Sequence, residues 1–179
     1  MLLSDTTIKK YLTEGLIKVL PEVKPDDVKS IGIRLHLGRD FLKPLPGKEI
    51  NFKENSDSFF ESLKVENSGY FLQPGEFILG TTAERFQVPR NIVAFLDGRS
   101  TLARLGLGVH VTSQFADGNY DNASSVTLEI KNNGPFKILL TPGMAICMLS
   151  FFELSEPVSS EARFLYKNQT TVTPPDIQA

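Results

Sequence analysis

Two groups of polar side chains in this 179-residue chain are of types that could act on a charged ligand. The first is Asp97–Gly106 (DGRSTLARLG), where arginines and hydroxyls crowd around the expected start of a short helix capped by Ser100. Backbone N–H groups at a helix N-terminus and the fork-shaped donors of arginine both favour an anion. The segment predicts a phosphate site made by Arg99, Ser100, Thr101 and Arg104. A solvated surface turn explains the same residues equally well on physics alone.

A candidate acid–base residue follows on a later strand. In Val126–Lys131 (VTLEIK) apolar and polar residues alternate, which predicts a strand with its apolar side against the core and Glu129 on the opposite side. A carboxylate held beside an anchored ligand can act as a general acid and base. Asp117, in the turn FADGNY, is a second carboxylate of interest. A solvated glutamate and an ordinary turn aspartate are the competing interpretations.

The residues that usually bind zinc are sparse. The chain has two isolated histidines, His36 and His110, which we interpret as hydrogen-bonded structural residues. Its one cysteine, Cys147, lies in the apolar run Met144–Phe152 and is expected to be a buried small hydrophobe. A cysteine-rich zinc site and an intrachain disulfide are therefore excluded.

The elements that must position these residues are mostly short strands. Apolar or alternating runs separated by Pro-Gly and Asn-Gly turns are typical of an all-β sandwich, jelly roll or barrel. A short helix capped by Ser4 or Asp5 and ended by Gly15 precedes them. We expect one domain over residues 1–179, because no internal boundary is visible. The expected strands are Ile31–Leu37, Tyr70–Leu72, Glu76–Thr82, Ile92–Leu96, Val109–Thr112, Val126–Ile130, Phe136–Leu140 and Ala145–Phe152.

Other segments carry weaker signals. LQPGEFI at 72–78 echoes LTPGMAI at 140–146, so two similar hairpins are expected. Residues 51–68 are polar without a pattern and predict an exposed loop. The C-terminus contains two prolines and no apolar period, which predicts a mobile tail over roughly residues 165–179.

Charge and hydropathy narrow the class of partner. The formal net charge is −2, whereas proteins that bind duplex nucleic acid normally carry a basic excess, so no nucleic acid polymer is expected as a partner. No apolar run approaches the ~20 residues of a membrane span, and no signal peptide is recognisable at the N-terminus. We therefore expect a cytoplasmic protein without a membrane partner.

Asp97–Ser113 (DGRSTLARLGLGVHVTS) resembles the signature of dCTP deaminases, which share a fold with trimeric dUTPases. Further segments agree in order: YFLQPGEFILGTTAE at 70–84, VTLEIKN at 126–132, LTPGMAICMLSF at 140–151 and YKNQ at 166–169. The resemblance implies a mostly β, distorted β-barrel or jelly-roll-like subunit with the dUTPase fold. It implies a homotrimer with sites between subunits and a tail that closes over dCTP or dUTP. It also implies Mg²⁺ bound with the triphosphate, and no zinc.

The resemblance assigns the chemical roles as follows. Arg99, Ser100 and Thr101 fall at phosphate-binding positions, and Ser100 also helps to hold the reactive water. Glu129 falls at the position of the catalytic glutamate, and Arg104 stabilises the site around the water and that carboxylate. Glu129 would take a proton from water and deliver one to cytosine N3, so that hydroxide adds at C4 and ammonia leaves.

Further positions are assigned to the nucleoside. Ser113 would bind substrate through its backbone carbonyl. Asp117 falls where the family meets the deoxyribose 3′-hydroxyl or, in dUTPases, activates water. Tyr120 falls near the family's aromatic residue, and Lys167 and Gln169 match tail residues that reach the nucleotide.

The chain departs from the family pattern at several positions. Arg34 stands where an aspartate is usual, His36 where an arginine is usual, and Ser113 replaces a common alanine. The turn after Asp117 is about two residues longer than usual, and the tail lacks the usual ending. The leading hypothesis is a dCTP deaminase. The alternatives are a bifunctional enzyme that forms dUMP, a dUTPase, and a nucleotide-binding regulator without catalysis. Glu129 favours deamination, because plain dUTPases lack that carboxylate.

Overall fold

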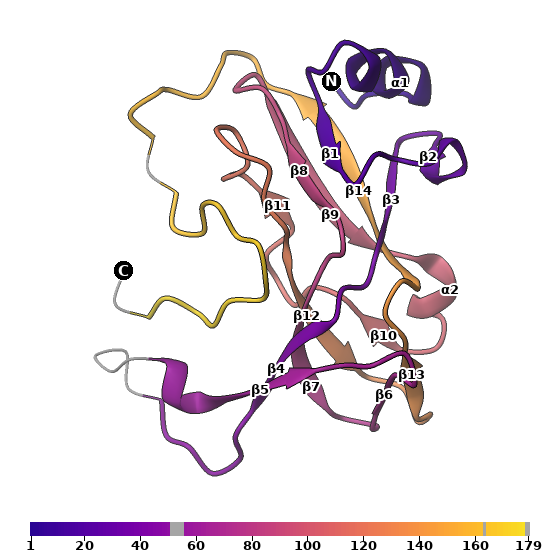
Figure 1. Cartoon of the computed structure of the whole chain (residues 1–179), viewed down its shortest axis with the longest axis vertical. Coiled ribbons are helices and arrows are strands. Elements are labelled where there is room, and N and C mark those ends of the chain that lie inside the picture. The colour runs from indigo at the N-terminus through magenta and orange to yellow at the C-terminus, as the bar shows by residue number, and fades with distance from the viewer. Residues whose placement is uncertain (51–55, 163, 178–179) are drawn as a thin grey trace.

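The computed structural model describes residues 1–50, 56–162 and 164–177, and its strands dominate (Figure 1). The helical elements are α1 Asp5–Thr13, η1 Pro25–Asp27, η2 Ser56–Phe59 and α2 Ser100–Ala103. The first strands are β1 Lys18–Leu20, β2 Val28–Lys29, β3 Gly32–His36, β4 Asp40–Pro44, β5 Phe60–Lys64, β6 Tyr70–Leu72 and β7 Phe77–Thr81. The later strands are β8 Arg85–Gln87, β9 Ile92–Gly98, β10 Leu107–Gly108, β11 Phe115–Ala116, β12 Thr127–Asn132, β13 Ile138–Leu140 and β14 Ala145–Glu153.

The strands form two larger and two smaller antiparallel sheets. One five-stranded sheet has the order β10-β12-β7-β4-β5 and the other β11-β9-β14-β3-β2. Strands β1 and β8 form one two-stranded sheet, and β6 and β13 form another. The described strands close no barrel. The mostly β class and the short N-terminal helix are confirmed.

Alternating burial along the strands builds one large core. In β12 the side chains of Leu128 and Ile130 are fully buried, whereas Glu129 between them is only partly covered. Strand β14 contributes Phe151, and β4 contributes Phe41. Burial of a large apolar side chain is worth about 1.5–3 kcal/mol, so these side chains hold both larger sheets to one common core.

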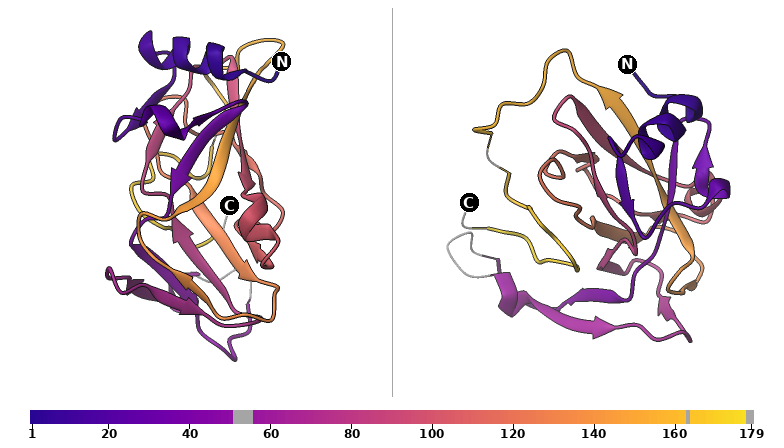
Figure 2. Two further views of the ribbon diagram at one scale, coloured as in Figure 1. Left: turned by 90° about the vertical axis from the view of Figure 1, so that its right-hand side faces the viewer. Right: turned by 45° about the horizontal axis from the view of Figure 1, so that its top comes forward.

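Helix α1 closes one end of the core, as both views of Figure 2 show. Ile8 is its fully buried side chain, and the segment before it is tied to β14 by a hydrogen bond from the Leu3 amide to the Phe151 carbonyl, 2.9 Å. Ser4 occupies the N-cap position as predicted, although its side chain makes no capping hydrogen bond to the backbone.

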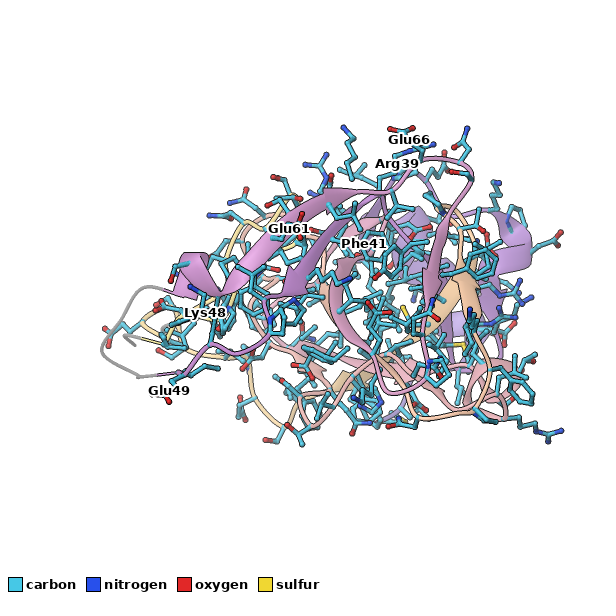
Figure 3. All side chains as sticks on the ribbon, turned by 90° about the horizontal axis from the view of Figure 1, so that it is seen from below. Arg39, Phe41, Lys48, Glu49, Glu61 and Glu66 are labelled. Carbon is cyan, nitrogen blue, oxygen red and sulfur yellow. The ribbon has the colours of Figure 1, made fainter. Side chains whose placement is uncertain are left out.

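The strand pair β4–β5 shows how an edge separates polar from apolar side chains (Figure 3). Arg39 and Glu66 lie at its outer border with their charged groups 3.9 Å apart, and Glu61 is exposed. Phe41 lies beneath them with 1% of its surface exposed. Strand β5 falls within residues 51–68, where a loop was predicted. That prediction is wrong for residues 60–64, and its residues 51–55 lie outside the described part of the chain.

Two other local predictions need correction. The segments 72–78 and 140–146 each form strand, Pro-Gly turn, strand, but they are not hairpins. Instead β6 and β13, the strands that lead into the two Pro-Gly turns, pair with each other. Residues 109–112 bend rather than form a strand, because the Val111 amide donates to a side-chain carboxylate instead of a ladder carbonyl.

Candidate functional site

A cavity of about 790 Å³ lies between the described C-terminal segment and the body of the protein. Residues 111–119 form one wall, and β12 contributes Thr127 and Glu129. Strand β7 contributes Phe77 and Leu79, and the C-terminal segment lines another side of the cavity. The volume is within the range of pockets that enclose small-molecule ligands.

Glu129 stands in this cavity because the alternation of β12 turns it away from the core. It pairs with Leu79 of β7, and its own amide donates to the Val109 carbonyl at 3.0 Å. Its Oε2 accepts a hydrogen bond from the Val111 backbone amide at 2.6 Å. Among the described residues Oε1 has no hydrogen-bond partner. One oxygen is thus fixed and the other is available to a ligand or water.

The segment from Ser113 to Asp117 runs along the same cavity. Ser113, Phe115 and Asp117 are exposed, and the residues between them are partly covered. All three exposed residues line the cavity. The structure therefore brings Ser113 and Asp117 together with Glu129, and it adds Phe115, which the sequence analysis did not single out. The signal for Phe115 was its place two residues before Asp117, on the same side of an extended chain.

Tyr120 is placed differently. Its side chain is 6% exposed, does not line the cavity, and packs with its ring centroid 5.2 Å from that of Phe164. Burial raises the pKa of Tyr120, and the nearby Asp117 carboxylate adds to the effect. The longer turn is anchored on β8, where the Asn119 side chain donates to the Phe86 carbonyl at 3.1 Å.

The described C-terminal segment packs against the turn and β12. Gln169 is buried and lines the cavity, and its backbone carbonyl accepts from the Ser125 amide at 2.8 Å. Its side-chain amide donates to Thr173 Oγ1 at 2.7 Å. Lys167 is exposed, does not line the cavity, and has its Nζ 5.8 Å from the centroid of the Phe164 ring. Residues 178–179 of the predicted tail lie outside the described chain.

The predicted phosphate turn lies elsewhere in the single chain. Helix α2 begins at Ser100, and Arg99 rather than Ser100 occupies the N-cap position. Arg99 Nη1 donates to the Ala145 carbonyl at 2.7 Å, while Ser100, Thr101 and Arg104 are exposed. None of these four residues lines the Glu129 cavity. Figure 1 shows α2 at the right and the C-terminal segment at the left.

The two histidines have different surroundings. His36 Nδ1 lies 2.6 Å from Glu84 Oε1, and its Nε2 lies 3.8 Å from Asp27 Oδ1, so its structural interpretation is confirmed. His110 Nε2 contacts the Gln114 side-chain amide at 3.0 Å, whereas its buried Nδ1 has no hydrogen-bond partner among the described residues. The described residues contain no group of three or more His, Cys, Asp or Glu side chains placed to hold a metal ion.

No helix in the described chain is long and apolar enough to cross a membrane. Cys147 is fully buried, as predicted.

The fold is shared with a solved dCTP deaminase. The structure of 2′-deoxycytidine 5′-triphosphate deaminase from Agrobacterium tumefaciens superimposes with a TM-score of 0.63 at 20% identity. The match covers 83% of this chain and 47% of that one, so this chain spans about half its length. At that identity the likeness concerns the fold alone.

The sequence relationship is closer for other proteins. Residues 2–154 match the family model described as dCTP deaminase-like, and the chain belongs to that family. It is 36% identical to a dCTP deaminase from Rhodospirillum rubrum, covering 97% of this chain and 95% of that protein. It is 38% identical to a dUMP-forming dCTP deaminase from Dictyoglomus thermophilum, covering 94% and 91%.

Proposed function

We propose that this protein deaminates dCTP hydrolytically to dUTP and ammonia, with Glu129 as the proton carrier. The observation that carries the proposal is the position of the Glu129 carboxylate and the hydrogen bonding of its two oxygens. It stands in a nucleotide-sized cavity with Oε2 fixed by the Val111 amide and Oε1 without a partner among the described residues. Family membership supports dCTP as the substrate.

The reaction transfers both protons of one water molecule, the first to the ring and the second to the leaving amino group. Glu129 Oε1 accepts a proton from water and delivers it to cytosine N3, which makes C4 electrophilic. The resulting hydroxide adds at C4 and its proton passes to the amino group. The C4–N bond then breaks, ammonia leaves with the electron pair of that bond, and the oxygen becomes the C4 carbonyl. The Val111 amide keeps the carboxylate oriented throughout. Water and dCTP are thereby converted into dUTP and ammonia with no external redox partner.

The phosphates are assigned to Arg99, Ser100, Thr101 and Arg104, with Ser100 and Arg104 also acting on the reactive water. In one chain these residues lie outside the Glu129 cavity. A site between subunits of a homotrimer would bring the turn of one copy to the carboxylate of another, which supports the assembly that the family resemblance implies.

Magnesium enters this proposal with the substrate. No described cluster of carboxylates and histidines is arranged for an ion, so the donors that fit Mg²⁺ are the triphosphate oxygens. When bound, the ion would neutralise phosphate charge next to the arginines. The deamination steps are assigned to the side chains of this protein alone.

A second candidate is a bifunctional enzyme that continues to dUMP. Asp117 is exposed in the same cavity as Glu129, and a carboxylate there could activate water for diphosphate hydrolysis. The Dictyoglomus thermophilum relative bears a dUMP-forming name.

The deciding experiment is chromatographic product analysis with dCTP and, separately, dUTP, each with Mg²⁺. Ammonia and dUTP from dCTP, with dUTP itself left intact, are the expected result. Accumulation of dUMP from both substrates identifies the bifunctional enzyme, and dUMP from dUTP alone identifies a dUTPase. Unchanged nucleotides in both reactions, with tight binding, identify a regulator and refute catalysis.

A further inference from the structure

The phosphate turn, residues 99–104, is built around a helix that is too short to hold its own position. Helix α2 has four residues, of which Leu102 is buried. A helix of this length has no stability of its own in water, so its position depends on the contacts at its two ends. At its start, the Arg99 guanidinium donates to a backbone carbonyl of β14. Its far end continues into Leu105 and Gly106, whose amides donate back to α2 carbonyls.

That far end packs on the loop that follows β12, residues 133–136. The Asn133 amide donates to the Gly106 carbonyl at 2.8 Å. The backbones are so close that a Cβ atom on Gly134 would collide with the carbonyl oxygen of Leu105, and one on Gly106 would lie 2.5 Å from the Gly134 Cα atom. Gly106 also has a φ of +87°, whereas Gly134 has no positive φ. A substitution at Gly134 therefore tests the close contact alone.

The loop itself is held by a buried side chain. Asn132, the last residue of β12, is fully buried. Its Nδ2 donates to the Phe136 carbonyl at 2.7 Å and to the Leu72 carbonyl at 3.1 Å. Its Oδ1 accepts from the Gly134 amide at 3.1 Å. A buried polar side chain with satisfied hydrogen bonds is rigid, so the loop is a fixed support for the phosphate turn.

We infer that Gly134 is a positioning residue for the phosphate turn. Because it has no side chain, the end of the turn packs directly on the loop after β12, and the arginines and hydroxyls of the turn are held where they meet the triphosphate. This inference rests on the proposed function, in which those residues bind the phosphates. A side chain at position 134 would push Leu105, and α2 with it, away from the loop. A displacement on the order of 1 Å is enough to weaken such contacts strongly.

The same displacement should leave the proton carrier in place. Glu129 lies three residues before Asn132 on β12, and this strand is paired with β7 from Thr127 to Lys131. The side chain added at position 134 would point at α2 and not at this ladder. We therefore expect an effect on phosphate binding that is separate from proton transfer.

The test compares dCTP with dCMP, which share the nucleoside and differ in the phosphates beyond the first. Gly134→Ala should weaken dCTP binding roughly tenfold, the size of one lost charge-assisted hydrogen bond, and should weaken dCMP binding less than about threefold. Gly108→Ala on β10 is the matched control, because the nearest neighbour of a Cβ atom there would be the His110 carbonyl oxygen at 3.7 Å. It should leave both affinities unchanged.

Affinities should be measured by calorimetry with Mg²⁺ in a Glu129→Gln background, so that no turnover occurs. In the parent background, Gly134→Ala should raise KM for dCTP by a larger factor than it lowers kcat. A role in stability alone would lower Tm and leave the ratio of the dCTP and dCMP affinities unchanged, and that result overturns the inference.

A measurement on the parent protein does not depend on how the variant folds. Hydrogen exchange followed by mass spectrometry should show that dCTP slows exchange both in the phosphate turn and in residues 133–136, and that dCMP slows it less. The Asn133 amide is the direct reporter, because its hydrogen bond to the Gly106 carbonyl is part of the contact. Slower exchange in the phosphate turn without a change in residues 133–136 overturns the inference.

Failure of this inference and of the proposed function can be told apart. An unchanged affinity ratio in a folded Gly134→Ala variant overturns the inference even when the parent protein releases ammonia, and if the variant does not fold, the exchange measurement decides. If the parent releases no ammonia, the proposed function fails, and the affinity ratio still decides the role of Gly134. A parent protein that binds dCTP no more tightly than dCMP overturns the inference, because the turn then makes no contact with the outer phosphates.

Discussion

Replacing Glu129 by glutamine tests the proton-transfer role of this side chain separately from the hydrogen bond that orients it. The amide oxygen can still accept the Val111 N–H, which now reaches Glu129 Oε2 at 2.6 Å. The other atom becomes an NH₂ group that donates hydrogen bonds and cannot take a proton from water. The substitution therefore removes acid–base capacity while it preserves the hydrogen bond that orients the side chain.

The substitution should change the free energy of unfolding only slightly and should lower kcat strongly. A hydrogen bond to a charged group contributes about 1.5–3 kcal/mol and a neutral one about 0.5–1.5 kcal/mol, so the free energy of unfolding should fall by about 1 kcal/mol. In a protein of this size that lowers Tm by roughly 2–4 °C. Loss of general acid–base catalysis should lower kcat by roughly 10²–10⁴-fold, which is about 2.7–5.4 kcal/mol in the barrier.

The assay is steady-state ammonia release from dCTP, with dCTP affinity measured by calorimetry on the same preparation. Glu61→Gln is the control, because Glu61 is an exposed carboxylate on β5 that does not line the cavity. It should match the parent. A Glu129→Gln variant whose kcat stays within about threefold of the parent value would remove this carboxylate from the mechanism. A large drop in kcat accompanied by unfolding at the assay temperature would contradict the stability part of the reasoning.

Three further outcomes are expected. Arg99→Ala and Glu129→Gln should each lose most of their activity alone. Subunits of the two, unfolded and reassembled together at equal amounts, should regain up to about a quarter of the parent activity if each site joins one residue from each of two subunits. No recovery in verified mixed assemblies would place both residues in one subunit's site. Burial opposes ionisation of Glu76, but the hydrogen bond from the Tyr70 hydroxyl helps to hold the pKa of Glu76 below its usual value. The resulting stabilisation is present above the unfolded pKa of about 4.3 and is lost as the pH falls through the lower folded pKa. Urea unfolding should therefore show that Glu76→Gln is less stable than the parent at pH 7. The difference in the free energy of unfolding should disappear in acid. Burial raises the pKa of the Cys147 thiol, so a disulfide reagent should label it only after denaturation, and rapid labelling of the native protein would contradict its burial.

The alternation of apolar and polar residues correctly predicted strand β12 and the side of it on which Glu129 lies. Strand β12 was found because apolar residues at every second position admit one arrangement against a core, and the same pattern placed Glu129 on the opposite side. Strand β14 was expected from a continuous apolar run, and helix α1 from a capping residue at Ser4 or Asp5 and a terminating Gly15. Strand β5 was missed because FESLK carries too few apolar residues, and its pairing with β4 is a long-range contact that no local pattern reports.

The site was predictable in its residue types but not in its arrangement. The pairing of Glu129 with the Val111 amide depends on a bend at residues 109–112, where the sequence VHVT favours a strand. A side-chain carboxylate competes there with the sheet for a backbone donor, and such competition appears only once the chain is folded. Burial of Tyr120 likewise follows from its contact with Phe164, which lies 44 positions further along the sequence.

Two of the segments in which the sequence departs from the family pattern, the longer turn and the C-terminal segment, contact each other in the folded chain. The Asn122 side chain, in the longer turn, donates to Asn168 Oδ1 in the C-terminal segment at 2.9 Å. The Tyr120 and Phe164 rings also pack together, and the Ser125 amide donates to the Gln169 carbonyl. In the sequence alone, the longer turn and the C-terminal segment are two separate differences from the family. In three dimensions residues of the longer turn contact the C-terminal segment directly, and both segments contribute to the wall of the cavity that contains Glu129.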